Sequence, residues 1–423
     1  MTASIGRRWV FGVVALATAI SAAIAQESSI RMQCPSATGT DIHPGANNPG
    51  IKCGHLVAGD GMVTMANDYT DGELGGKPLY VFGFALTDNF PPGGPAVNDP
   101  GYPGWIMTEG TLAANAPAPT IVVDEDDEVF LSLTNVGMAM RPDLFDPHSI
   151  HWHGFPHAAS IFDGVPDSSI SINMGASLSY YYYAKDAGTY MYHCHVEAAE
   201  HMQMGMVGNL YVRPRQNNLP NGTSLGATTH VTGNKYAFND GDGTTRYDAE
   251  YPIQMGSFDP TFHDASFNVQ PLPFAGMRDR YFLLNGRGYP DTVNPAVLTT
   301  TDPLGKVQPS QRVSSLIEAA PNKRILLRIS NLNVTTFNTL GTNGIPMEVI
   351  GLDARLLRDG DGNNMYYKTN SLTLGGGQSA DVILDTTGLT PGSIYFLYTT
   401  NLDRLANDAE NFGGMMTEIR ITN

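Results

Sequence analysis

The chain has 423 residues, and 42% of them are apolar, which is enough to form substantial cores in more than one domain. Charged residues make up only 15%, against about 25% in an average soluble domain, while glycine (46) and proline (28) are abundant. This composition favours a protein that is rich in strands and turns. The net charge of −17 argues against nucleic acid or an anionic membrane surface as a partner.

Residues 1–25 have the features of a signal peptide. Arg7 and Arg8 form a short basic region, residues 9–20 are mostly apolar, and residues 23–25 read Ala-Ile-Ala, as before a cleavage site. The apolar stretch is short for a membrane span, and no later segment reaches about 18 consecutive apolar residues. We therefore expect a periplasmic or secreted protein without a membrane span.

Residues 26–75 are rich in glycine, asparagine and proline, and we predict that they form an irregular N-terminal arm. Two of the three cysteines, Cys34 and Cys53, lie in this arm. In an exported protein such a pair predicts a disulfide bond. The third cysteine, Cys194, then needs a different role.

Strand signals dominate the rest of the chain. Apolar and polar side chains alternate over residues 128–135, directly after an acidic turn at 124–127. Residues 179–183 and 189–192 predict two further strands, separated by a short Asp-Ala-Gly turn.

A second half repeats this pattern. Residues 324–331 alternate in the same way as residues 128–135, and both segments end in a hydroxyl residue followed by asparagine. A Gly-Met pair closes each half, at residues 205–206 and 414–415, and the polar segment 214–250 reads as a linker. We therefore predict an all-β protein of two tandem Greek-key β-sandwich domains. The two domains are expected at residues 76–215 and 230–423.

Seven of the eleven histidines crowd into residues 148–201. Successive side chains of a strand point to opposite faces. In the sequence His193-Cys194-His195, the two imidazoles therefore share one face and the thiol points to the other.

The same parity applies to an earlier cluster that contains His148, His151 and His153. If this cluster is extended, His151 and His153 share a face and His148 has the opposite parity. Two candidate sites follow, on opposite sides of one pair of strands. The first contains His148, Cys194, His201 and Met206. The second contains His151, His153, His193 and His195.

The first set has the ligand chemistry of a blue-copper centre, with two imidazoles, a thiolate and an axial thioether. Zinc also binds two imidazoles and a thiolate, but it has little use for a thioether, and its structural sites normally have four strong ligands. Four converging imidazoles in the second set suit copper that binds and reduces dioxygen. Cys194 joins the two sets covalently and predicts a short path for electrons between them.

Both clusters resemble motifs of the multicopper oxidases. Their His-Pro-x-His-x-His-Gly motif is similar to the segment His148-Ser-Ile-His151-Trp-His153-Gly154. Their His-Cys-His … His … Met motif is similar to Tyr192-His193-Cys194-His195 followed by His201 and Gly205-Met206. The resemblance covers roughly residues 76–423 and includes Phe162-Asp-Gly-Val-Pro166 and Leu284-Asn-Gly-Arg287.

The resemblance implies two cupredoxin-like domains and several copper ions. It assigns type 1 copper to His148, Cys194, His201 and Met206. It assigns type 2 copper to His151 and the type 3 pair to His153, His193 and His195. It also implies a copper-dependent oxidoreductase with dioxygen and a reducing substrate as partners.

The second half departs from the family pattern. A trinuclear cluster needs eight histidines, four from each of two domains, and the second domain has no His-x-His pair. Asn338, followed by Asn343, stands where the related two-domain nitrite reductases carry a histidine, and residues 398–401 contain neither cysteine nor histidine. We therefore expect a second domain without copper ligands. Either the cluster is reduced, or His230, His263 or another protein completes it.

The leading interpretation is an exported multicopper oxidase that couples one-electron oxidation of its substrate to reduction of dioxygen. A single-copper electron carrier or copper-binding protein is the non-enzymatic alternative. A copper nitrite reductase is a second enzymatic alternative, although that family typically has an acidic residue in place of His151 and a non-ligand in place of His195. Two-domain relatives commonly form trimers, so we expect a homotrimer.

Overall fold

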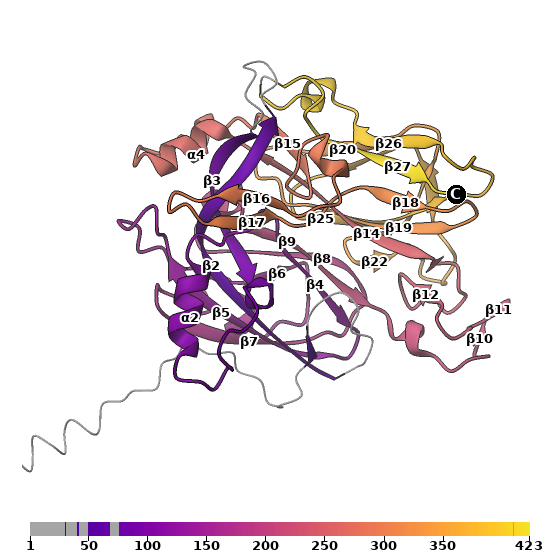
Figure 1. The fold of residues 1–423 in the computed structure, drawn as a ribbon. Coiled ribbons are helices and arrows are strands. Elements are labelled where there is room, and N and C mark those ends of the chain that lie inside the picture. The colour runs from indigo at the N-terminus through magenta and orange to yellow at the C-terminus, as the bar shows by residue number, and fades with distance from the viewer. Residues whose placement is uncertain (1–29, 31–39, 42–49, 68–75, 409) are drawn as a thin grey trace, which may run out of the picture.

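The computed structural model describes residue 30 and residues 40–41, 50–67, 76–408 and 410–423. The predicted signal peptide and Cys34 lie outside the described residues, so the cleavage site and the disulfide bond to Cys53 stay predictions. Strands dominate the part of the chain that the structure describes, which confirms the expected all-β class (Figure 1). No described helix is long and apolar enough to cross a membrane.

Two sheets form the first half of the molecule. One has the strand order β1-β2-β5-β7, with β3 also paired to β2, and the other has the order β4-β9-β8-β6. The strands of the first sheet are β1 (Thr40–Asp41), β2 (Ile51–Asn67), β3 (Gly76–Leu86), β5 (Glu128–Gly137) and β7 (Ser177–Tyr183). Those of the second are β4 (Ala118–Asp124), β6 (His151–His153), β8 (Gly188–His193) and β9 (Val207–Arg213).

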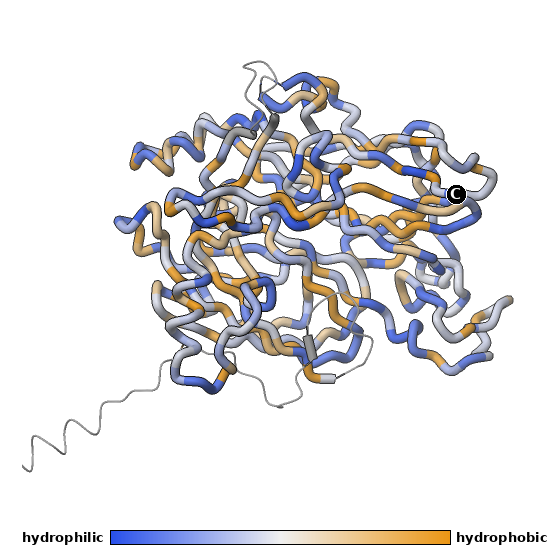
Figure 2. Tube along the Cα trace, in the orientation of Figure 1, coloured by the Kyte–Doolittle hydropathy of each residue, from blue (hydrophilic) through white to orange (hydrophobic). Residues whose placement is uncertain are grey.

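The predicted alternation builds the core between these sheets. Val129, Leu131 and Leu133 of β5 are completely buried in one apolar cluster together with Leu210 and Val212 of β9. Figure 2 shows the same pattern along the chain, with hydrophobic segments inside both halves and hydrophilic segments at many outer loops. The predicted strand at 128–135 is confirmed.

The expected irregular arm is wrong for residues 51–67, which form the long strand β2. This strand lies between β3, to which it is antiparallel, and β5, to which it is parallel. Its glycines sit where neighbours approach closely: a Cβ at Gly59 would lie 2.9 Å from Val136 Cγ2, and one at Gly61 would lie 3.0 Å from Ala114 Cβ. Glycine, which suggested a loop, here permits close packing within a sheet.

The second half again contains two larger sheets. One has the order β15-β14-β19-β25-β21-β22, with β23 also paired to β21, and the other has the order β18-β27-β26-β20-β24. The strands of the first are β14 (Ala249–Phe258), β15 (Tyr281–Leu284), β19 (Arg324–Asn331), β21 (Met347–Leu352), β22 (Arg355–Leu356), β23 (Tyr367–Thr369) and β25 (Gln378–Asp385). Those of the second are β18 (Ile317–Ala319), β20 (Asn338–Thr342), β24 (Ser371–Leu374), β26 (Ile394–Thr399) and β27 (Met416–Ile421).

Short elements connect and cover these sheets. The predicted linker carries the hairpin strands β10 (Ser224–Leu225), β11 (Thr228–Thr229), β12 (Lys235–Tyr236) and β13 (Arg246–Tyr247), and a later hairpin pairs β16 (Leu298–Thr301) with β17 (Val307–Gln311). The described α-helices are α2 (Tyr102–Gly110), α3 (Ala198–Met204) and α4 (Pro260–Phe267). The described 3₁₀ helices are η1 (Thr87–Asn89), η2 (Ser160–Phe162), η3 (Arg215–Asn218), η4 (Phe274–Gly276), η5 (Asp291–Val293) and η6 (Leu402–Leu405).

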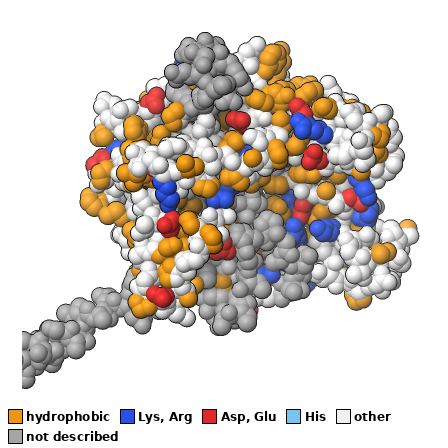
Figure 3. Space-filling model, viewed as in Figure 1, with side chains coloured by type: hydrophobic (Ala, Val, Ile, Leu, Met, Phe, Trp, Pro, Cys, Tyr) orange, Lys and Arg blue, Asp and Glu red, His pale blue; other side chains and the backbone are white. Residues whose placement is uncertain are grey.

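A buried charge network joins the two halves. Arg328 of β19 is completely buried, with Nε 2.9 Å from Glu250 Oε2 and Nη1 3.2 Å from Asp381 Oδ1. Thr189 of β8 donates a hydrogen bond to the same Asp381 oxygen over 2.6 Å, so the network reaches across to the first half. The charges on the outer surface do not form such a network in the face that Figure 3 shows, where charged side chains of both signs are scattered.

Replacing Arg328 with methionine should lower the free energy of unfolding by about 3–5 kcal/mol, because the buried carboxylate of Asp381 loses its cation. Glu250 keeps its ion pair with Arg213. Denaturant titration measures the change. Arg355→Met is the matched control, since its ion pair with Asp186 spans 3.5 Å at a largely exposed position, and it should change the free energy of unfolding by less than about 1 kcal/mol. Equal effects of the two substitutions would contradict this account of the network.

Candidate metal centres

Strands β6 and β8 position both candidate sites. They pair antiparallel, with His151 opposite His193 and His153 opposite Met191. Cys194 follows directly after β8, and its N–H donates to the Met206 carbonyl over 3.2 Å. Helix α3 then ends at Gly205, whose φ of 118° suits glycine, and the chain returns as β9.

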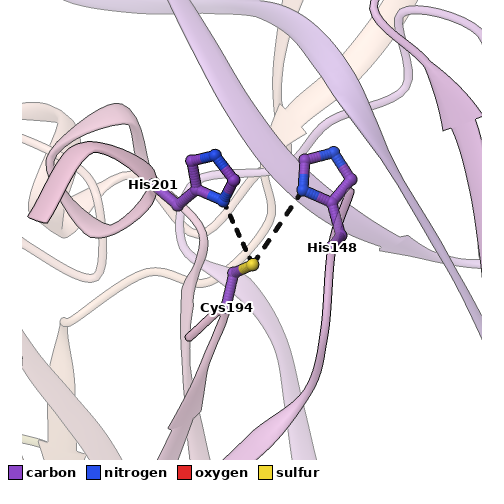
Figure 4. Close-up of side chains that lie close together, drawn as sticks. All are labelled: His148, Cys194 and His201. Carbon is purple, nitrogen blue, oxygen red and sulfur yellow. Dashed lines mark hydrogen bonds between the residues drawn. The ribbon is translucent and has the colours of Figure 1, made fainter. Parts of the chain in front are cut away.

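The structure brings the first predicted set together, as Figure 4 shows for its imidazoles and thiol. His201 Nδ1 lies 3.1 Å from Cys194 Sγ, and His148 Nδ1 lies 3.9 Å from the same sulfur. The three ligand atoms all lie within 4.8 Å of one another, and the three residues are completely buried. Met206 is also completely buried, and its N–H donates to the His201 carbonyl over 2.9 Å.

Further contacts orient these groups. Asp146 Oδ2 lies 3.0 Å from His201 Nε2, and the Ser149 N–H donates to Cys194 Sγ over 3.4 Å. His148 Nε2 is buried without a hydrogen-bond partner among the described residues. Both imidazoles therefore direct Nδ1 towards the sulfur, so that one metal ion could contact both rings and the thiol.

Cys194 and His201 stabilise each other's charged forms. Burial raises the pKa of the Cys194 thiol, but the charge of His201 and hydrogen bonds from His148 and His201 outweigh burial and lower the pKa to about 5. Burial lowers the pKa of His201, but Cys194 and Asp146 raise it well above its usual value. The metal-free site therefore holds a thiolate at neutral pH, which is the form that binds metals.

The structure also brings the second set together. The ring centroid of His151 lies 5.7 Å from that of His153, 5.2 Å from that of His193 and 5.1 Å from that of His195. One ligand atom from each of His151, His153 and His193 lies within 4.8 Å of the others. His195 borders this triad, with its ring centroid 5.4 Å from that of His193.

Hydrogen bonds to carbonyl groups orient two of these rings. His151 Nδ1 lies 2.6 Å from the Asp163 carbonyl oxygen, and His193 Nδ1 lies 2.8 Å from that of Cys194. Burial lowers the pKa of His193 to about 3 and also lowers the pKa values of His151 and His153. The rings are therefore neutral at physiological pH, with lone pairs free to bind a metal.

A cavity of about 480 Å³ opens in front of these histidines. Besides the four rings, the cavity is lined by Ala198, Ala199 and Met202 around α3 and by residues 332–337 and 376–377 of the second half. The lining residues of the second half include no histidine, cysteine or carboxylate. Asn338 is not among them: it is buried, and its Oδ1 accepts a hydrogen bond from Arg404 over 2.7 Å.

The two histidines of the second half do not complete the site, because neither lines this cavity. His263 is buried in α4, with Nδ1 2.5 Å from the Tyr80 carbonyl oxygen and Nε2 3.0 Å from that of Gln203. His230 Nδ1 lies 3.3 Å from the Tyr236 hydroxyl. Both contacts point to structural roles, so His230 and His263 are removed as candidate ligands for the cavity.

Sequence reasoning missed three groups that contact the two sets. Asp146 lies only two residues before His148, and Asp163 lies inside the family-like segment 162–166, so local sequence carried a signal for both. Gly377 packs against His153 from the other half of the molecule. No local pattern indicates that contact, because it depends on how the two halves meet.

Comparisons with known proteins agree with this geometry. Two multicopper oxidase family models match residues 108–217 and 268–414, which together exceed half of the chain. The chain belongs to the multicopper oxidase family.

Individual relatives match the chain only in part. Multicopper oxidase MCE of Talaromyces pinophilus is 34% identical over 103 residues, which are 24% of this chain and 16% of that protein. L-ascorbate oxidase of Cucurbita pepo var. melopepo is 25% identical over 288 residues, 66% of this chain and 45% of that protein. The matched region is thus less than half the length of either relative.

Solved structures confirm the fold of two tandem cupredoxin-like domains. A blue copper oxidase from Nitrosomonas europaea has a TM-score of 0.58 at 21% identity, over 87% of this chain and 85% of that chain. At this identity the likeness concerns the fold. The candidate metal ligands of the present chain therefore rest on its own geometry.

In the metal-free protein, the ultraviolet absorbance of the Cys194 thiolate should persist as the pH falls and disappear around pH 5, because that is where its pKa lies. His201→Gln removes the principal positive charge and should move this midpoint up towards the ordinary thiol value. The Cys194→Ser protein supplies the baseline for other chromophores. A wild-type midpoint at about 8.5, the value of an unperturbed thiol, would contradict the described site.

Proposed function

We propose that this chain is an exported copper oxidase that takes electrons from a reducing substrate at one site and passes them to dioxygen at the other. One observation carries the proposal: a single tripeptide serves both sites. The thiol of Cys194 faces His148 and His201, while the flanking His193 and His195 line the cavity.

The donor atoms of the first site fit a blue-copper centre. His148 Nδ1, His201 Nδ1 and Cys194 Sγ would form the trigonal ligand plane, and Met206 would supply the thioether. The thiolate is already formed before a metal binds. His148 Nε2 has no hydrogen-bond partner among the described residues, which is consistent with a ring that binds a metal through Nδ1. Copper bound at the two sites would supply one-electron redox chemistry.

The second site fits a metal that meets a small molecule. The imidazoles of His151, His153 and His193 are neutral because burial lowers their pKa values. Carbonyl groups fix the orientations of His151 and His193. The cavity in front of them is large enough for dioxygen and is open to it, while Met202 and Phe337 give its wall an apolar part. The chain's own residues thus hold the metal on one side and leave the other side free.

The path between the sites is short and continuous. Cys194 is bonded through the backbone to His193 and His195, and its carbonyl also accepts a hydrogen bond from His193 Nδ1 over 2.8 Å. This hydrogen bond adds a second connection between Cys194, which carries the thiol, and the ring of His193, which lines the cavity. An electron that enters at the buried His148–Cys194–His201 site therefore needs no mobile carrier to reach the cavity.

The alternatives are distinguished by specific residues. The single-copper electron carrier is favoured by the second-half wall of the cavity, which offers no strong ligand. A nitrite reductase is disfavoured by the histidines at 151 and 195. Export and the homotrimer stay proposals, and the second half of the same chain already lines the cavity without a neighbouring subunit.

Copper-loaded protein should be blue and should also show a type 2 signal in electron paramagnetic resonance. Cys194→Ser should abolish the blue absorption, because that band requires the thiolate. Oxygen uptake, measured beside nitrite turnover on one sample, should identify dioxygen as the acceptor. A blue protein with one copper ion and no type 2 signal would favour the electron carrier, and nitrite turnover without oxygen uptake would favour the reductase.

A further inference from the structure

One ring of the cavity is turned differently from its neighbours. His151 and His193 use Nδ1 to bind carbonyl groups, which leaves Nε2 for a metal. In His153 it is Nδ1 that faces the site, 3.3 Å from His193 Nε2. Its Nε2 points the other way, towards the second half of the molecule.

Gly377 is the residue that Nε2 meets there. A Cβ at position 377 would lie 2.6 Å from His153 Nε2 and 3.0 Å from its Cε1, so only glycine permits this contact. The contact is anchored, because the Gly377 N–H donates to the Asn331 carbonyl over 2.7 Å at the end of β19.

The rest of the wall offers little else to a metal. Its polar side chains are Asn333, Thr335 and Thr336, which carry amide and hydroxyl oxygens. After the triad of His151, His153 and His193, only one imidazole remains in the cavity, that of His195. A second or third copper ion would therefore lack the several nitrogen ligands that copper prefers.

We propose that Gly377 is a positioning residue that turns His153 to bind through Nδ1, so that the cavity holds one copper ion on His151, His153 and His193. The inference rests on the proposed function, since it assumes that copper enters the cavity. The second half then contributes a backbone contact in place of the histidines it lacks. His195 lines the cavity but is not needed to hold the ion.

Metal analysis and electron paramagnetic resonance of copper-loaded protein test this directly, without an activity assay. Wild-type protein should contain two copper ions per chain, one blue and one type 2. Gly377→Ala should lose the type 2 ion and keep the blue one, because its Cβ displaces the His153 ring. Gly388→Ala is the matched control: its φ of 79° imposes similar backbone strain to the 87° at Gly377, but a Cβ there meets nothing within 4 Å.

His195→Ala separates the three-histidine site from a larger cluster. This variant should retain both copper ions, whereas His153→Ala should lose the type 2 ion. More than two ions in the wild type, loss of the type 2 ion in His195→Ala, or its retention in Gly377→Ala would overturn the inference. A wild type that binds only blue copper would instead contradict the proposed function. Equal thermal unfolding of Gly377→Ala and Gly388→Ala excludes misfolding as the cause of a lost type 2 copper ion.

Discussion

The pairing of β6 with β8 is the constraint on which both sites depend. It places His151 opposite His193, so that imidazoles from two strands converge on one face. One residue further, the alternation of an extended chain turns Cys194 to the opposite face, where His148 and His201 lie. Two chemically different sites, one soft and buried, the other open to a cavity, are thus separated by a single peptide unit.

The second half of the chain has a different task in this arrangement. It binds the first half through the buried network around Arg328 and presents residues 332–337 and 376–377 to the histidines. Such a wall shapes the cavity and orients a ring without supplying a strong ligand. The two halves therefore contribute differently to the cavity: the first half supplies its imidazoles, and the lining residues of the second half include no histidine, cysteine or carboxylate.

Sequence alone predicted the strand at 128–135 and the division of the histidines between two faces, because both follow from the period of two in a strand. It failed at residues 51–67, where close packing against Val136 and Ala114 explains the glycines. It also missed Gly377, whose contact with His153 joins residues that are far apart in the chain. Local patterns indicate which side chains share a face, but not which segment packs against that face.

The central claim is that two separate metal positions flank Cys194. Diffraction from crystals of the copper-loaded protein, recorded at the copper absorption edge, tests it most directly. The account predicts one anomalous peak among His148 Nδ1, Cys194 Sγ and His201 Nδ1, and a second, single peak among His151, His153 and His193. A cluster of peaks in the cavity would contradict the single-ion site, and the absence of a peak beside Cys194 would contradict the account as a whole.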